Sequence, residues 1–351
     1  MNSWATGLAL TAAMAVSGCV TTPVPSSAAP PAVTAADRPA TFDYPQGPIA
    51  YQNHDLPELD SRYYRVKRIS FTSHGDNGQP DNLVTARYYR GVQPGPRPLL
   101  IVLPIWGSHT YPSTVISNGV RRRSDGAVDV LMIEGADFLI NWYEFAAAPT
   151  QSEFEAEVDR MGNRLWTAAM DTRRFVDWAQ QREDIDPDRI GVIGFSMGAL
   201  VGSLVAASED RLAATVLVMG AADFPGVMAA CDGRPGMARE TLTQRFDWSV
   251  EEYRARVGAR IAHLDPSHFT EYVDPTRIFM IDAYYDDCMP RETRDALWES
   301  LGEPRRMSFM AAHKTAFLYM TPLAGNYMRG EIYRFLEAKL QAGRPVYRRR
   351  L

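Results

Sequence analysis

Residues 190–201 read Ile-Gly-Val-Ile-Gly-Phe-Ser-Met-Gly-Ala-Leu-Val, and the expected type of fold follows from them. The first half is apolar and β-branched, as in a buried strand, and the second half begins a helical apolar pattern. A strand, a sharp turn and a helix are therefore predicted, with Ser196 at the tip of the turn. Gly194 and Gly198 have no side chains, and any other residue at these two positions would clash in so tight a turn. We expect the Ser196 hydroxyl to be a nucleophile at the positive end of the helix.

The sequence on both sides of this turn alternates between strand and helix patterns. Short apolar runs typical of buried strands occur at 99–103, 128–133, 214–219, 277–283 and 307–310. Amphipathic helices are predicted over 154–179, 292–301 and 328–340, and an antiparallel strand pair over 63–72 and 83–89. The alternation predicts an α/β fold in which helices cover both faces of a mostly parallel sheet. Its functional site should lie beyond the carboxyl ends of the strands.

Residues 224–270 interrupt this alternation. They contain Cys231, several Gly and Pro residues, and then a helical stretch rich in Arg and Glu. An insertion between the carboxyl ends of two strands is expected to cover Ser196 as a small helical cap. The predicted domain therefore spans residues 49–345 and contains this cap.

The N-terminus has the features of an export signal. Within residues 1–18, the stretch 4–18 is apolar and rich in Ala, and it ends in Val-Ser-Gly directly before Cys19. This resembles a bacterial lipoprotein signal peptide, which implies cleavage before Cys19 and lipidation of that cysteine, although no Lys or Arg precedes the apolar run. Residues 19–48, rich in Pro and Ala, are expected to form an unstructured tether. The expected location is the periplasm, anchored to a membrane by lipid, and Val20 in place of an aspartate favours the outer membrane.

Composition narrows the classes of partner. The chain has 351 residues, is 46% hydrophobic and 23% charged, and carries a net charge of −5, which argues against nucleic acid as a partner. No apolar run is long enough for a membrane span in the mature chain. The sequence has neither a His-Glu-x-x-His nor a paired Cys-x-x-Cys motif, so we predict no metal and no cofactor.

Three segments carry a resemblance to the α/β-hydrolase superfamily. They are 194–198, 286–290 (Asp-Asp-Cys-Met-Pro) and 313–317 (His-Lys-Thr-Ala-Phe). Residues 186–194, Asp-Pro-Asp-Arg-Ile-Gly-Val-Ile-Gly, are also similar to the dienelactone-hydrolase and prolyl-oligopeptidase-like branch, and the resemblance covers roughly residues 60–340. Dienelactone hydrolases carry cysteine as the nucleophile, and the serine of this chain favours ordinary ester or amide hydrolysis.

The resemblance implies the chain order serine, acid, histidine. Of the six histidines only His313 follows Asp286, so the order selects His313 as the base that activates Ser196. Asp286 is the expected acid because it stands four places before a proline, as in the family. Asp287 is the next candidate, and Asp223 is a lesser one.

Two backbone N–H groups are expected to bind the oxyanion of the reaction. One belongs to Met197, which follows the nucleophile. The other should come from the turn after the strand at 99–103, where the family often has His-Gly and this chain reads Pro-Ile-Trp-Gly-Ser. By position Trp106 is the expected donor, and Ile105 is the alternative.

The resemblance implies a serine hydrolase, most readily a carboxylesterase acting on a small acyl substrate. A peptidase or a thioesterase would use the same residues. A catalytically silent scaffold that binds a cell-envelope partner is the alternative from another class, and the presence of Ser196, Asp286 and His313 argues against it.

The chain has three cysteines. If Cys19 is lipidated, two remain, Cys231 and Cys288. In an oxidising compartment such a pair is a candidate disulfide. In the family's sheet the two strand ends concerned lie close together on the same face. A bridge between the two cysteines and two packed thiols both remain open at this stage.

Overall fold

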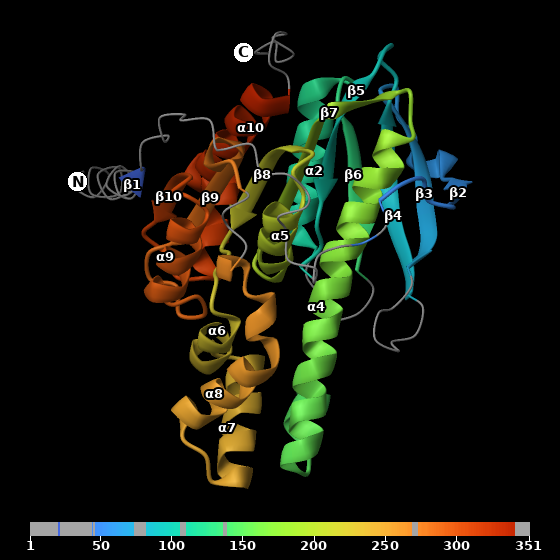
Figure 1. The fold of residues 1–351 in the computed structure, drawn as a ribbon. Coiled ribbons are helices and arrows are strands. Elements are labelled where there is room, and N and C mark those ends of the chain that lie inside the picture. Colours follow the sequence, from blue (N-terminus) through green and yellow to red (C-terminus); the bar gives the residue numbers. More distant parts are fainter. Residues whose placement is uncertain are drawn as a thin grey trace, which may run out of the picture.

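The computed structural model describes residues 20–21, 44, 46–73, 82–105, 110–135, 139–268 and 273–340. The described strands form one ten-stranded sheet in the order β1-β10-β9-β8-β7-β5-β6-β4-β3-β2 (Figure 1). Its parallel centre consists of β5 (Arg97–Val102), β6 (Asp129–Glu134), β7 (Ile185–Phe195), β8 (Leu212–Val218), β9 (Ile278–Ala283) and β10 (Arg305–Phe309). Antiparallel strands β4 (Asn82–Gly91), β3 (Tyr64–Ser73) and β2 (Gln52–Asp55) extend one edge, and β1 (Val20–Thr21) pairs with β10 at the other.

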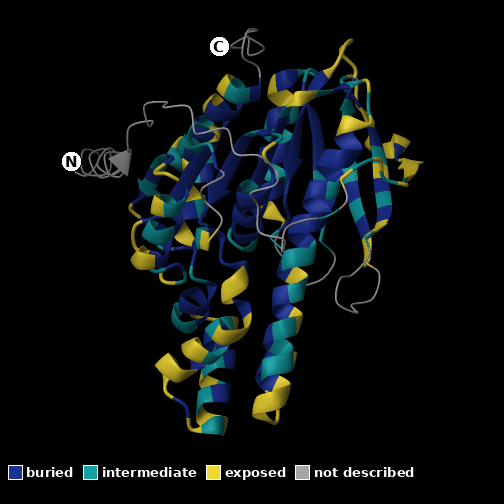
Figure 2. Cartoon of the chain, in the orientation of Figure 1, coloured by how far each residue is buried: buried dark blue, intermediate teal, exposed yellow. Residues whose placement is uncertain are grey.

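Two hydrophobic cores lie on the two faces of this sheet. Successive residues of a strand point to opposite faces, so Leu99 and Ile101 join one core and Leu100 and Val102 the other. Helices α4 (Gln151–Gln180), α5 (Met197–Ser208) and α9 (Arg291–Ser300) cover the first face. Helices α2 (Tyr111–Ser124) and α10 (Tyr327–Leu340) cover the second. Figure 2 shows the central strands as buried between these layers. The α/β fold with a mostly parallel sheet, predicted from the sequence, is confirmed.

A helical cap stands beyond the carboxyl ends of the strands. Helices α6 (Phe224–Ala230), α7 (Arg234–Phe246) and α8 (Val250–Ile261) come from the insertion expected at 224–270. Helix α4 has 30 residues, about 45 Å, so it extends past the sheet and runs along these helices (Figure 1).

Contacts across this cap join segments that are far apart in the sequence. The rings of Phe154 on α4 and Trp248 meet edge to face, with centroids 5.2 Å apart. Arg245 Nη1 donates to the carbonyls of Ala146 and Ala148, at 2.8 and 2.6 Å, at the end of α3 (Trp142–Ala147). The cap therefore consists of α3, the first half of α4 and α6 to α8, which is more than the predicted insertion.

Within the expected tether at 19–48, the structure describes residues 20–21, 44 and 46–48. Val20 and Thr21 pair with the edge strand β10, and Tyr44 packs on the domain. The guanidinium of Arg173 lies 4.4 Å from the centre of the Tyr44 ring, and Arg211 Nη2 donates to the Tyr44 hydroxyl at 2.9 Å. Contacts with the domain therefore begin before residue 49. A cation–π contact and a hydrogen bond to the same tyrosine stabilise this packing, which composition alone did not reveal.

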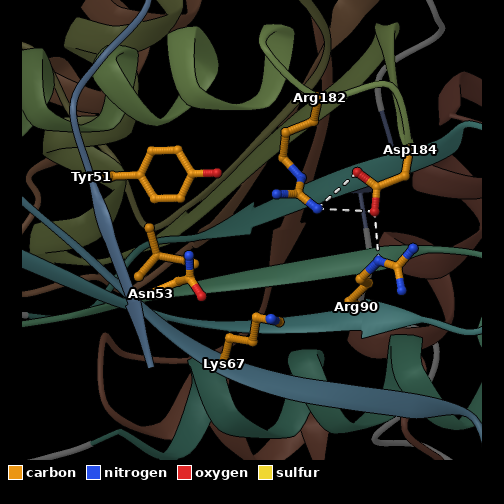
Figure 3. Close-up of a pocket in the computed structure, with 7 residues that line it drawn as sticks. Tyr51, Asn53, Lys67, Arg90, Arg182 and Asp184 are labelled. Carbon is orange, nitrogen blue, oxygen red and sulfur yellow. Dashed lines mark hydrogen bonds and ion pairs between the residues drawn. The ribbon is translucent and has the colours of Figure 1, made fainter. Parts of the chain in front are cut away.

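Ion pairs fasten the hairpin edge of the sheet to the turn between α4 and β7. Arg90 Nε donates to Asp184 Oδ2 at 2.5 Å, and Arg182 Nη2 donates to the same oxygen at 3.0 Å (Figure 3). Burial acts to raise the pKa of Asp184, but hydrogen bonds from Arg90 and Arg182 outweigh it and lower the pKa to about 2. The hollow of about 230 Å³ beside these groups, which Tyr51 and Lys67 also line, shares no lining residue with the hollow at Ser196 described below. We therefore interpret this cluster as structural.

Asp171 is a buried carboxyl on α4. Burial raises its pKa to about 7, and the hydrogen bond that Asn82 Nδ2 donates to Oδ2 at 3.2 Å offsets only part of this effect. The unfolded chain releases the same proton near pH 4. The stability contributed by protonated Asp171 is therefore fully present below about pH 4 and is lost as the pH rises through 7.

Replacing Asp171 by asparagine should increase stability at neutral pH. The amide keeps the shape and cannot ionise, so we expect Asp171→Asn to raise the free energy of unfolding at pH 8 by up to about 4 kcal/mol. At pH 4 the gain should be small. Urea denaturation at pH 4, 6 and 8 measures this, with exposed Glu183→Gln as the control. A gain that is the same at all three pH values would contradict the titration of Asp171.

Candidate active site

Ser196 stands in the turn between β7 and α5. Its backbone has φ 50° and ψ −117°, a left-handed conformation that non-glycine residues seldom adopt. The turn is tight enough that a Cβ on Gly194 would lie 2.0 Å from the carbonyl oxygen of Gly198. A Cβ on Gly198 would lie 2.5 Å from the carbonyl oxygen of Pro104. The two glycines therefore permit the turn, as the sequence pattern predicted.

His313 connects Ser196 to a buried acid. Ser196 Oγ lies 3.0 Å from His313 Nε2, and His313 Nδ1 lies 2.8 Å from Asp286 Oδ2. Asp286 follows β9 and His313 follows β10, so the carboxyl ends of three strands supply the three side chains. The Asp286 side chain is fully buried and that of His313 is 11% exposed.

The hydrogen bonds define which ring nitrogen carries the proton. A carboxylate only accepts, so Nδ1 of His313 must donate to Asp286, and Nε2 is left to accept from the Ser196 hydroxyl. Asp286 is itself fixed, because the backbone N–H groups of Cys288 and Met289 donate to Oδ1 at 2.9 and 2.8 Å. This arrangement can remove a proton from Ser196 and stabilise the imidazolium that forms.

The other candidate acids lie elsewhere. Asp287 is exposed to solvent. Asp223 caps the N-terminus of α6, where it accepts from the backbone of Gly226 at 3.0 Å, and it also pairs with Arg254. Of the three carboxyls considered, the structure brings only Asp286 to His313.

The other histidines of the described chain do not approach Ser196 through any hydrogen bond. His54 lies on the exposed strand β2, and His263 and His268 are exposed near the end of the cap. His74 and His109 lie outside the described residues.

The expected oxyanion donors are only partly described. Met197 begins α5 directly after Ser196, where helix N–H groups have no intrahelical partner. Trp106 lies outside the described residues, whereas Ile105 is described and half-buried. The approach of Gly198 to Pro104 places the end of β5 and the turn after it against the serine turn.

A hollow of about 330 Å³ opens beside Ser196, between the serine turn and the cap. Sequence analysis did not identify its lining, although Phe224, Val227 and Met228 follow the i, i+3, i+4 spacing of one helix face. The full lining is Ile140, Trp142, Met161, Leu165, Ser196, Met197, Leu200, Phe224, Val227, Met228, Cys231, Asp232, Gly233, Arg234, Pro235, Cys288, Met289 and Lys314.

Cys231 and Cys288 are joined by a disulfide, with their Cα atoms 3.7 Å apart. Cys231 ends helix α6 of the cap, and Cys288 lies two residues after Asp286. Since the Cys288 N–H donates to Asp286, the bridge ties the cap to the loop that holds this acid.

Within the described part of the chain, no group of three or more His, Cys, Asp or Glu side chains is arranged to hold a metal ion. No helix there combines the length and the apolar character needed to cross a bilayer. Cys19 and the predicted signal peptide lie outside the described residues.

Comparison with known proteins agrees with the fold and the serine turn. Residues 138–232 match the model of the dienelactone hydrolase family, a segment that contains Ser196 and ends before Asp286. The uncharacterized protein MT2702 of Mycobacterium tuberculosis (strain CDC 1551 / Oshkosh) is 27% identical over 175 residues. These residues are 50% of this chain and 37% of the relative, so this chain spans well under half of that protein's length.

Two solved structures are similar over most of the chain. The acetyl xylan esterase from Paenibacillus sp. R4 is 18% identical with a TM-score of 0.61, covering 84% of this chain and 90% of its own. Acetyl xylan esterase 1 from Thermoanaerobacterium sp. JW/SL YS485 is 14% identical with a TM-score of 0.57, covering 83% and 88%.

The fold is that of the α/β-hydrolases, and the segment that contains the serine turn matches the dienelactone hydrolase family. The resemblance to this superfamily, which the sequence indicated, is confirmed.

Proposed function

We propose that the protein is a serine carboxylesterase in which Ser196, His313 and Asp286 form the catalytic triad. The observation that carries this proposal is the continuous hydrogen-bond chain from Ser196 Oγ through His313 to a fully buried carboxylate. A scaffold that only bound a partner would gain nothing from a strained serine aimed at an oriented imidazole.

In the proposed reaction, Ser196 Oγ attacks the ester carbonyl while His313 Nε2 takes the hydroxyl proton. The backbone N–H of Met197 and one from the turn after β5 stabilise the oxyanion, with Trp106 or Ile105 as the second donor. The imidazolium then returns its proton to the departing alcohol, leaving an acyl group on Ser196. A water molecule, activated by His313, releases the carboxylic acid and restores the serine.

A peptidase or a thioesterase with the same triad remains the second candidate. The family match favours an ester, because dienelactones are cyclic esters, and the two acetyl xylan esterases point the same way. No cofactor takes part in the proposed chemistry.

Labelling with a fluorophosphonate probe tests the activated serine directly. We expect one phosphonyl group per chain, attached to Ser196. A panel of matched ester, thioester and peptide substrates then ranks the three activities by kcat/KM, with the ester expected first. Absence of labelling would overturn the triad, and a peptide ranked first would overturn the esterase.

We further propose that the mature protein is anchored in the cell envelope by lipid on Cys19, on the sequence resemblance described above. In a Gram-negative host the full chain should fractionate with membranes, and Cys19→Ser should abolish incorporation of labelled fatty acid. An acylated terminus with several chains binds far more firmly than a single fatty acid. The variant should keep its esterase activity. Wild-type protein recovered unmodified from the cytoplasm would contradict this proposal.

A further inference from the structure

The hollow beside Ser196 has an apolar interior. Met161 and Leu165 of α4 and Phe224 and Met228 of α6 line it, and each of these four residues is at most 5% exposed. They belong to two separate helices, so the apolar interior exists only where α4 and α6 both border the hollow.

The charged residues that line the same hollow lie at its mouth. Asp232, Arg234 and Lys314 are all exposed to solvent, in contrast to the buried interior. A molecule seated here would therefore place its apolar part inward and its polar part at the surface, because burying apolar area is favourable and burying unpaired charge is costly.

We propose that this hollow is the acyl pocket of the enzyme and that it selects esters of medium-length apolar acids. The inference rests on the proposed serine esterase function. When Ser196 Oγ bonds to the acyl carbon, the alcohol leaves with the proton that His313 returns, and the chain stays attached to a serine that itself lines the hollow. The apolar chain extends between α4 and α6, and the alcohol departs at the charged mouth.

The size of the hollow gives the expected chain length. About 330 Å³ corresponds to the volume of about ten water molecules, far more than the methyl group of an acetyl ester fills. A chain of about six to ten carbons would occupy it. Each methylene that is buried in an apolar site in the transition state raises kcat/KM by about fourfold, if its full burial free energy is gained there.

The test uses p-nitrophenyl esters from acetate to dodecanoate on the mature protein. We expect kcat/KM to rise with chain length, to exceed that of acetate by at least about 100-fold at octanoate, and to level off once the hollow is filled. An acetate value equal to or above that of octanoate, with Ser196 still labelled by the fluorophosphonate, overturns the acyl pocket and leaves the esterase standing. Absence of both labelling and ester hydrolysis overturns the two together.

A substitution at a residue that lines the hollow tests whether the hollow determines the selectivity for acyl chain length. Val227 lines it and is 7% exposed, so Val227→Phe should lower the ratio of octanoate to acetate kcat/KM by at least about tenfold. Val250→Phe is the matched control, because Val250 lies on α8 of the same cap, is 43% exposed and does not line the hollow. An unchanged ratio in Val227→Phe contradicts the proposal.

A smaller side chain at the same position covers the case in which Val227→Phe does not fold. Val227→Ala enlarges the hollow, so the preferred chain should lengthen by about one or two carbons. Melting curves of all variants show which of them are folded. A folded Val227→Ala with the wild-type chain-length profile would overturn the proposal by itself.

Discussion

Replacing Ser196 by alanine is expected to lower kcat by about 10⁴-fold to 10⁶-fold and to abolish fluorophosphonate labelling. The alanine removes the oxygen that attacks the carbonyl, and what remains is the catalysis that substrate binding and the oxyanion donors supply. The fold should survive, since among the described residues the Ser196 side chain hydrogen-bonds to His313 alone. A Ser196→Ala variant that hydrolyses any accepted ester at near wild-type rate would show that another nucleophile is used.

His313→Ala should cost about as much as Ser196→Ala. The two side chains act as one unit, so the double variant should be hardly slower than either single variant. If the two losses in kcat multiplied in the double variant, Ser196 and His313 would act independently, which would contradict their role as a hydrogen-bonded pair. Steady-state kinetics on an ester that the wild type accepts, with thermal melting as the folding control, decide between these outcomes.

The acid offers a matched pair of neighbours. Asp286→Asn should lower kcat by about 10⁴-fold. The amide oxygen would keep the backbone donors of Cys288 and Met289, so the uncharged amide NH₂ would point at Nδ1 and His313 would lose its favoured tautomer. Asp287→Asn changes an exposed carboxyl next to it and should leave kcat within about threefold. The opposite ranking would move the acid by one residue.

The fold could be predicted from the sequence wherever a pattern was local. Short apolar runs predicted β5 to β10, and the amphipathic stripe predicted most of α4. Helix α2 was missed, because its sequence is rich in Ser, Asn and Arg and lacks a clear apolar stripe. Two of its serines are accommodated by hydrogen bonds: Ser113 Oγ donates to the carbonyl of Leu103 at 2.8 Å, and Ser124 Oγ lies 2.7 Å from the Tyr64 hydroxyl. A contact of this kind depends on a residue outside the helix, so the sequence of the helix alone does not predict it.

The site was predictable to the extent that chain order and turn chemistry define it. The glycines around Ser196 and the position of His313 after Asp286 selected three side chains that the structure joins by hydrogen bonds. The pocket was not predictable in this way. Its walls come from α4 and α6, about 60 residues apart in the sequence, and nothing in either segment records that they meet. A composition shift at 224–270 indicated a cap but not what the cap would pack against.

Loss of the disulfide between Cys231 and Cys288 is expected to have the second large effect. Opening a loop with a sequence separation of 57 residues costs about 4 kcal/mol of stability in the chain-entropy model. For a domain of roughly 300 residues that loss lowers Tm by about 6 °C. The bridge also borders the Asp286 loop, so its removal should lower kcat through a less well-held acid.

The double variant Cys231→Ser/Cys288→Ser, compared with wild type with and without dithiothreitol, separates these effects. Reduction should destabilise the wild type and leave the double variant unchanged, because only the former has a bond to break. Thiol counting on denatured, unreduced periplasmic protein should find no free thiol from this pair. If loosening of Asp286 is the cause of slower turnover, the double variant and the reduced wild type should share one lowered kcat. Their Ser196 should still react with fluorophosphonate, only more slowly. A wild type whose melting and kcat are indifferent to reduction would mean that the link between the cap and the acid loop does not depend on the bridge.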